Sequence, residues 1–268
     1  MRAPDLNGVQ AKITRALAHI AELEREVTAY HGREPYVVVV EDRPETGQRV
    51  AKVGQMREPI PDVLPLQVGD AAHNLRGALD HLAYQLSPGK DTAFPVWKPT
   101  RTPTSRDLSA LVSGKLRGVD PGVKEAIVAA QPYLGGAGEG LWVVDYLDNV
   151  DKHRLLLAVG AAHSSVSFDA AAMLRRAVAE NPEGPFRSED IPVMMLSLRP
   201  ADRYPVTVGT ELFLAPPQEF DAMAASFTLD VALGEPEAVA GEPIVPTLRH
   251  LADTVEAMVN AVASVLLR

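Results

Sequence analysis

The sequence predicts an α+β protein in which a helical bundle carries an antiparallel sheet. Long segments repeat apolar residues at the spacing of helices that pack on one side. Four shorter segments between residues 163 and 233 alternate or run apolar as strands do, and they are grouped without intervening long helices. The 268 residues, 46% of them hydrophobic, can bury a substantial core. We therefore expect a single α+β domain over residues 1–268.

About five helices are predicted from these apolar stripes and from the residues that begin and end them. In chain order they span about residues 8–31, 66–87, 121–131, 141–160 and 247–267. Gly32 ends the first, and Asp120 followed by Pro121 is typical of the start of the third. We expect the last helix to return and pack on the first ones.

The remaining segments are predicted to be strands and loops. A β-branched run at 36–40 and an extended run at 49–53 flank a turn, which predicts an N-terminal β-hairpin. Its four consecutive valines suggest cover on both faces. The strand-rich segment of about 163–233, with one short helix at 170–180, is predicted to form an antiparallel sheet inserted before the last helix. Prolines and threonines at 91–106 predict a surface loop. The glycine run at 135–140 is interpreted as a flexible turn, because it follows a helix and lacks the dinucleotide spacing.

Composition limits the classes of function. The net charge of −9 and the pI of about 5.3 argue against a broad nucleic-acid groove, although they leave room for a small basic patch. The absence of cysteine excludes disulfides, thiolate metal sites and cysteine nucleophiles. No apolar run reaches the roughly 18 residues of a membrane span, and the N-terminus lacks the apolar core of a signal peptide. We therefore expect a cytoplasmic protein with no membrane partner.

The second predicted helix has one apolar and one polar face. The apolar face collects Leu75, Ala78, Leu79, Leu82 and Leu86. The polar face collects His73, Asn74, Asp80, His81 and Tyr84 around Gly77. These side chains could bind a ligand, with Gly77 allowing close approach. Alternatively, the face is solvated or pairs with another helix through Gly77, and its histidines are structural.

The fourth predicted helix is also rich in polar residues. Asp145, Asn149 and His153 follow one another at one-turn intervals, and Asp148 with Lys152 forms a second such pair. Arg154 sits apart from that stripe, next to the core side of the helix. The residues could line a polar pocket or form an ordinary solvated helix end.

The two polar helices are predicted to be neighbours that share one cluster. Each of their polar groups would cost about 1–3 kcal/mol if it were buried without a partner. Mutual hydrogen bonding removes that penalty, and an aspartate opposite a histidine orients its imidazole ring.

Two segments carry a family resemblance. Residues 69–82 (GDAAHNLRGALDHL) and 148–154 (DNVDKHR) resemble a family of bacterial, often actinobacterial, proteins that has no assigned activity. The resemblance extends over the whole chain. It implies that the two polar helices act together, and it implies no reaction.

A second resemblance implies a chemistry. Arg76 and His81, with four residues between them, are similar to the Arg-x4–6-His motif of the HEPN-domain ribonucleases, which are helical bundles. That family cleaves RNA without a metal and commonly dimerises. The resemblance thus implies an endoribonuclease with RNA and a second copy of the chain as partners and without a cofactor. Arg76, His81 and His73 would be catalytic, with His81 as acid and base and Arg76 as the phosphate clamp. The binding residues would be Asn74, Asp80, Tyr84, Asp145, Asp148, Asn149, Lys152, His153 and Arg154.

Two other interpretations stay open. In the first, the chain is a non-catalytic helical-bundle protein that binds a ligand or a partner through a structural His/Asn/Asp network. In the second, Asp70 and His73 hold a metal whose ligand shell Asp145 or Asp148 completes. The sequence contains neither His-Glu-x-x-His nor Glu-x-x-His, so we predict no metal site.

Overall fold

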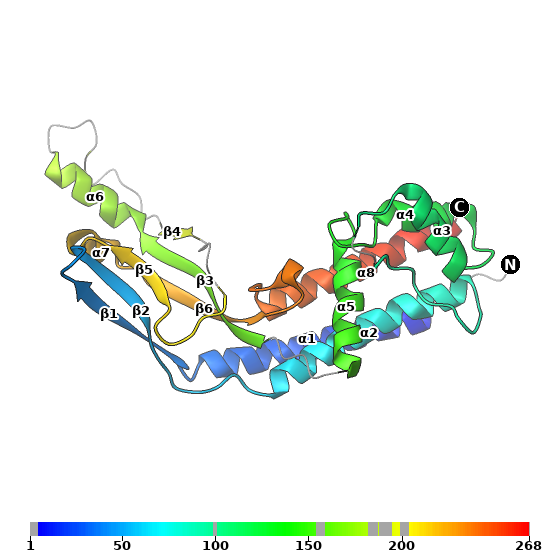
Figure 1. Ribbon diagram of the computed structural model, residues 1–268, viewed down its shortest axis with the longest axis horizontal. Helices are drawn as coiled ribbons and strands as arrows, with labels where there is room; N and C mark the ends of the chain where they lie inside the picture. Colours follow the sequence, from blue (N-terminus) through cyan, green and yellow to red (C-terminus); the bar gives the residue numbers. More distant parts are fainter. Residues whose placement is uncertain are drawn as a thin grey trace.

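The computed structural model describes residues 5–98, 101–153, 159–181, 187, 195–198 and 204–267. Within these ranges it has eight α-helices and two three-stranded antiparallel sheets, which confirms the predicted α+β class. The molecule is elongated, with a helical end, a β end, and a long first helix that reaches from one toward the other (Figure 1). The prediction of a single domain stays a prediction.

The helical end is built around α2. This helix (Val63–Leu86) contacts α1 (Asn7–His31), α5 (Glu139–His153) and α8 (Ile244–Leu266). Helix α8 also packs on α1, as expected for a returning C-terminal helix. Two shorter helices, α3 (Ser105–Lys115) and α4 (Pro121–Ala130), contact each other, and α4 leans on α8.

Two predicted helix boundaries need correction, and one helix was missed. Helix α2 begins at Val63 instead of 66, because Pro65 lies in its first turn, where a backbone N–H has no intrahelical acceptor. Helix α5 ends at His153 instead of 160, because strand β3 already begins at Val159. Helix α3 was not predicted at all. Its start carries a capping box between Thr104 and Asp107, a signal that the sequence contains.

The predicted hairpin is confirmed, but the strand-rich segment does not form one sheet. One sheet has the order β1-β2-β5 and the other the order β4-β3-β6. The six strands are β1 (Tyr36–Arg43), β2 (Gln48–Met56), β3 (Val159–Asp169), β4 (Met195–Leu198), β5 (Glu211–Ala215) and β6 (Ser226–Leu233). Strand β5 joins the hairpin, with Leu214 opposite Val50. The short helix α6 (Ala170–Glu180) was predicted, whereas α7 (Pro217–Met223), which contacts it, was not.

Two apolar cores hold these elements. The larger fills the helical end and includes Val231 and Leu233 of β6. The smaller lies between the sheets and is formed by Val53, Ala161, Val206, Leu212 and Leu229. The expected cover on both faces of the valine run is wrong, because β1 is an edge strand in which Val40 is exposed and the three valines before it are only half-buried. None of the helices in the described ranges combines the length and the apolar character that crossing a bilayer requires.

Candidate functional site

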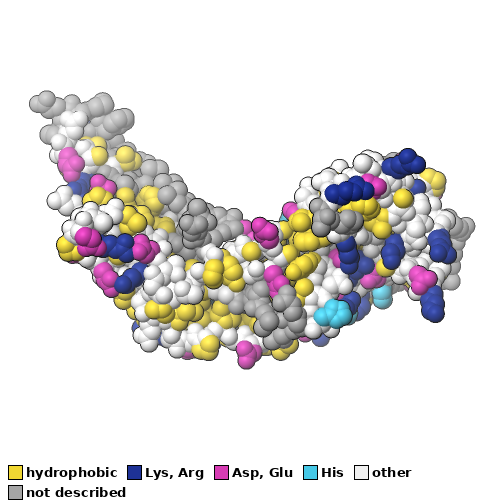
Figure 2. Space-filling view, in the orientation of Figure 1, with side chains coloured by type: hydrophobic (Ala, Val, Ile, Leu, Met, Phe, Trp, Pro, Cys, Tyr) yellow, Lys and Arg dark blue, Asp and Glu magenta, His cyan; other side chains and the backbone are white. Residues whose placement is uncertain are grey.

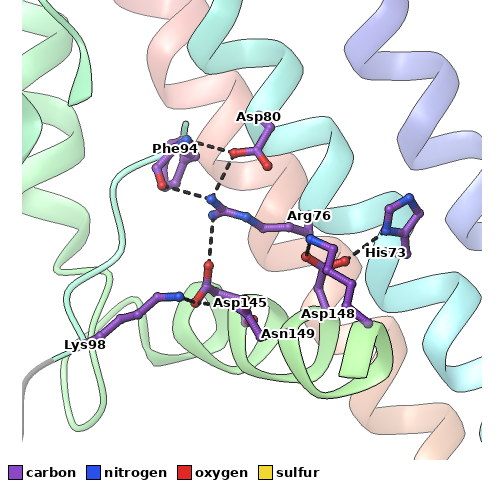
Figure 3. A network of polar contacts seen from close by, with 9 residues as sticks. His73, Arg76, Asp80, Phe94, Lys98, Asp145, Asp148 and Asn149 are labelled. Atoms are coloured by element: carbon purple, nitrogen blue, oxygen red, sulfur yellow. Dashed lines mark hydrogen bonds and ion pairs between the residues drawn. The ribbon is translucent and has the colours of Figure 1, made fainter. Parts of the chain in front are cut away.

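The polar residues of α2 and α5 meet where these two helices pack. His73 Nδ1 lies 2.9 Å from Asp148 Oδ1, and Arg76 Nη1 lies 3.4 Å from Asp145 Oδ1 (Figure 3). Both pairs join α2 to α5. The prediction that these helices are neighbours sharing one polar cluster is therefore confirmed.

Arg76 occupies the centre of this cluster. Its side chain is only 10% exposed, and Nη2 lies 2.9 Å from Asp80 Oδ1 and donates to the carbonyl oxygen of Phe94 at 3.2 Å. The backbone N–H of Phe94 in turn donates to Asp80 Oδ1 at 2.9 Å. Arg76 Nη1 has no hydrogen-bond partner among the described residues. The guanidinium thus ties α2 to α5, through the ion pair of Nη1 with Asp145, and to the segment 93–98, through Nη2.

Two carboxylates of α5 are buried beside it. The side chain of Asp145 is 6% exposed and that of Asp148 is 1% exposed. Asp145 is also 2.7 Å from Lys98 Nζ, and Asp148 is 2.5 Å from Lys152 Nζ. Each buried carboxylate is therefore contacted by two basic side chains, and such pairing lowers the cost of burying a charge away from water.

An open pocket of about 240 Å³ borders this network. Its walls come from α2, the segment 93–98, the C-terminal residue of α3, and α5. The lining residues are Arg76, Asp80, Ala93, Phe94, Val96, Lys98, Lys115, Asp145, Asp148, Asn149 and Lys152.

The other polar residues of α2 face α1. Lys12 Nζ donates to Asn74 Oδ1 at 3.3 Å, and a Cβ atom added to Gly8 would lie 3.1 Å from His81 Nδ1. Five residues of a helix turn through about 500°, so Arg76 and His81 project about 140° apart. The structure does not bring these two side chains together.

The remaining predicted site residues lie away from the pocket. Tyr84 and His153 are exposed and do not line it. Arg154 lies outside the described residues. In the part of the chain that the structure describes, no group of three or more histidine, aspartate or glutamate side chains is arranged to hold a metal ion.

Sequence reasoning missed Lys98 and Lys115. Lys98 belongs to the predicted surface loop, and Lys115 ends the helix that was not predicted. A signal was present, because Phe94-Pro95-Val96-Trp97 is an apolar run that a solvated loop does not need. Phe94 and Val96 are indeed buried, and they place Lys98 at the pocket.

Asp151 lies one turn beyond Asp148 at the edge of the network. Burial raises the pKa of its carboxyl, the charges of Asp70 and Asp148 raise it further, and His73 lowers it. The Asp151 carboxylate packs directly against Gly69 of α2, where a Cβ atom would overlap it. The ionised form of Asp151 is therefore unfavourable in the folded protein.

Replacing Asp151 by asparagine is expected to stabilise the protein at pH 7 by about 0.5 kcal/mol, the size of a like-charge repulsion along a helix. Because the folded pKa exceeds the unfolded one, this gain should shrink as the pH falls through the folded pKa and vanish below the unfolded value. Thermal melting at pH 7 and at about pH 3.5, which is below the usual aspartate pKa, measures this change in stability. The exposed Asp253→Asn is the control, and a gain that is equal at both pH values would contradict the prediction.

The chain was also compared with known proteins. Neither the protein-family models, nor the curated proteins, nor the solved structures contain a match to it.

Proposed function

We propose that the chain is a ligand-binding protein that holds a small polar molecule in the pocket between α2, α5 and residues 93–98. One observation carries the proposal: the charges of Arg76, Asp145 and Asp148 are buried beside an open pocket and not inside a filled core. Where a buried ion pair serves only to hold the fold together, replacing its charges by apolar residues often leaves the protein at least as stable. Ligand sites in helical bundles are commonly built from side chains on facing helices.

The size of the pocket limits the ligand. Its volume of about 240 Å³ is below the roughly 300–1,000 Å³ of sites for drug-sized molecules. The ligand is therefore a compound of few heavy atoms, held mainly by polar contacts.

Replacing Ala93 by phenylalanine is expected to fill the pocket without removing a polar contact. A panel of inorganic phosphate, succinate, glycine betaine, putrescine and glycerol covers anions, a zwitterion, a cation and a neutral polar compound. We expect at least one of them to raise the melting temperature of the parent, and Ala93→Phe to abolish that shift. Ala110→Phe, on the exposed surface of α3, is the control and should keep the shift. If no compound gives a shift that Ala93→Phe abolishes, the proposal is wrong.

The endoribonuclease interpretation, with RNA and a second copy as partners, stays a prediction. Binding is favoured over cleavage because the Arg76 guanidinium faces Asp80, Asp145 and the Phe94 carbonyl, whereas His81 faces α1. We expect no cleavage when the parent protein is incubated with single-stranded RNA and a chelator. Cleavage that disappears in His81→Ala, with unchanged thermal melting, would overturn the binding proposal in favour of a nuclease.

A further inference from the structure

We infer that the ligand of this pocket is a small anion, carrying a carboxylate or a phosphate group, which Lys98, Lys115 and Lys152 hold. The inference rests on the proposed function and names the class of ligand. Two properties of the pocket wall support the inference: its charge and its unused hydrogen-bond donors.

The wall of the pocket is positive in an acidic protein. Four basic side chains line it, Arg76 and the three lysines, against three carboxylates, those of Asp80, Asp145 and Asp148. The chain as a whole carries a net charge of −9. On the face shown in Figure 2, lysine and arginine side chains likewise gather at the helical end. A cleft of locally positive charge attracts anions.

The donors of the wall are largely unused. An ammonium group has three N–H donors. Lys98 makes one ion pair, with Asp145, and Lys152 makes one, with Asp148. Lys115 makes none within the described ranges. These three ammonium groups therefore leave donors that a ligand can satisfy.

The two buried carboxylates of the wall are already engaged on both oxygens. The Asp145 carboxylate faces Arg76 and Lys98 and accepts from Asn149 Nδ2 at 3.1 Å. Asp148 faces His73 and Lys152. Asp80 faces Arg76 and accepts from the Phe94 N–H. The unused donors of the lysines are therefore best met by acceptors that the ligand brings, and charged oxygens are the acceptors that bind ammonium groups most strongly.

The three lysines can converge on one molecule because they come from three segments. Lys98 follows the buried Phe94 and Val96, Lys115 is the last residue of α3, and Lys152 is in the last turn of α5. The side chains of Lys98 and Lys152 are 59% and 49% exposed, whereas the carboxylates that they contact are almost fully buried. A small anion at the mouth of the pocket could thus contact all three ammonium groups.

Replacing Lys115 by glutamine tests the inference, because that substitution breaks no ion pair within the described ranges. Calorimetric titration of inorganic phosphate and of succinate, at constant ionic strength, measures binding. We expect at least one anion to bind the parent, and Lys115→Gln to weaken it by about tenfold, the effect of one charged hydrogen bond. Lys90→Gln, an exposed lysine outside the pocket, is the matched control and should bind as the parent does. Binding of phosphate alone assigns a phosphoryl group, and binding of succinate alone assigns a carboxylate.

Lysine acetylation read by mass spectrometry locates the site. The bound anion should protect Lys98, Lys115 and Lys152, and it should leave Lys90 reactive. If anions bind Lys115→Gln as tightly as Lys90→Gln, the inference is wrong. If neither anion binds, but putrescine, betaine or glycerol gives a melting shift that Ala93→Phe abolishes, the inference is wrong while the proposed function stands. If no compound gives such a shift, both fail.

Discussion

Replacing Arg76 by methionine is expected to lower the free energy of unfolding by about 3 kcal/mol. Removing one partner of a buried ion pair costs about 3–5 kcal/mol, because the other charge stays buried. The lower end applies, since Lys98 remains beside Asp145 and since Asp80 is partly exposed. Methionine keeps an unbranched apolar stem in place of the arginine stem, so much of the loss reports the charge and the hydrogen bonds of the guanidinium.

A double substitution separates this effect from lost packing. Asp145→Leu in the background of Arg76→Met removes both charges, and we expect the double variant to recover much of the lost stability. Urea unfolding of the parent, the two single variants and the double variant measures the coupling. Lys98→Met is the control for an exposed partner and should cost no more than about 1 kcal/mol. Purely additive losses would show that Arg76 and Asp145 do not act as a pair.

Replacing Leu79 by alanine is expected to lower the free energy of unfolding by about 2–5 kcal/mol. Leu79 is fully buried in the helical core, on the helix that contacts α1, α5 and α8. The surrounding helices cannot all close on the space that its side chain leaves, so a cavity penalty adds to the lost burial.

Leu66 provides the matched control for this substitution. It lies on the same helix and is 51% exposed, so Leu66→Ala should change stability by no more than about 0.5 kcal/mol. Chemical unfolding of both variants gives the comparison. Equal losses for the two variants would contradict the assignment of α2 as the central helix.

The long helices could be predicted because their sequence repeats with the period of the structure. The stripes of α1, α2 and α8 identify the faces that are buried, and the position of Asp120 before Pro121 identifies the start of α4. The partner of β5 could not be predicted in this way. Its pairing with β2 depends on contacts between distant segments, and an apolar strand pattern does not specify which strand it joins.

The candidate site was predictable in part. The spacing of Asp145 and Asp148 on one helix, and of His73 and Asp80 on another, predicts two polar faces. Buried polar groups require hydrogen-bond partners, so the two faces are expected to pair. The sequence does not show which polar side chains of a helix contact which neighbouring helix. Arg76 turns toward α5, whereas Asn74 and His81 turn toward α1, and only the arrangement of three helices makes that distinction.

The pairing of β2 with β5 also affects how the chain is made. Roughly 150 residues separate these strands, so at about 5–20 residues per second a ribosome needs on the order of ten to thirty seconds to supply the third strand. During that interval the hairpin exposes the open edge of β2, with backbone groups that could pair with another nascent chain. Helix α1 likewise waits for α8, the last helix to be synthesised. Both ends of the molecule are thus completed late in translation, and chaperones that shield unpaired strands would matter most in the interval before that.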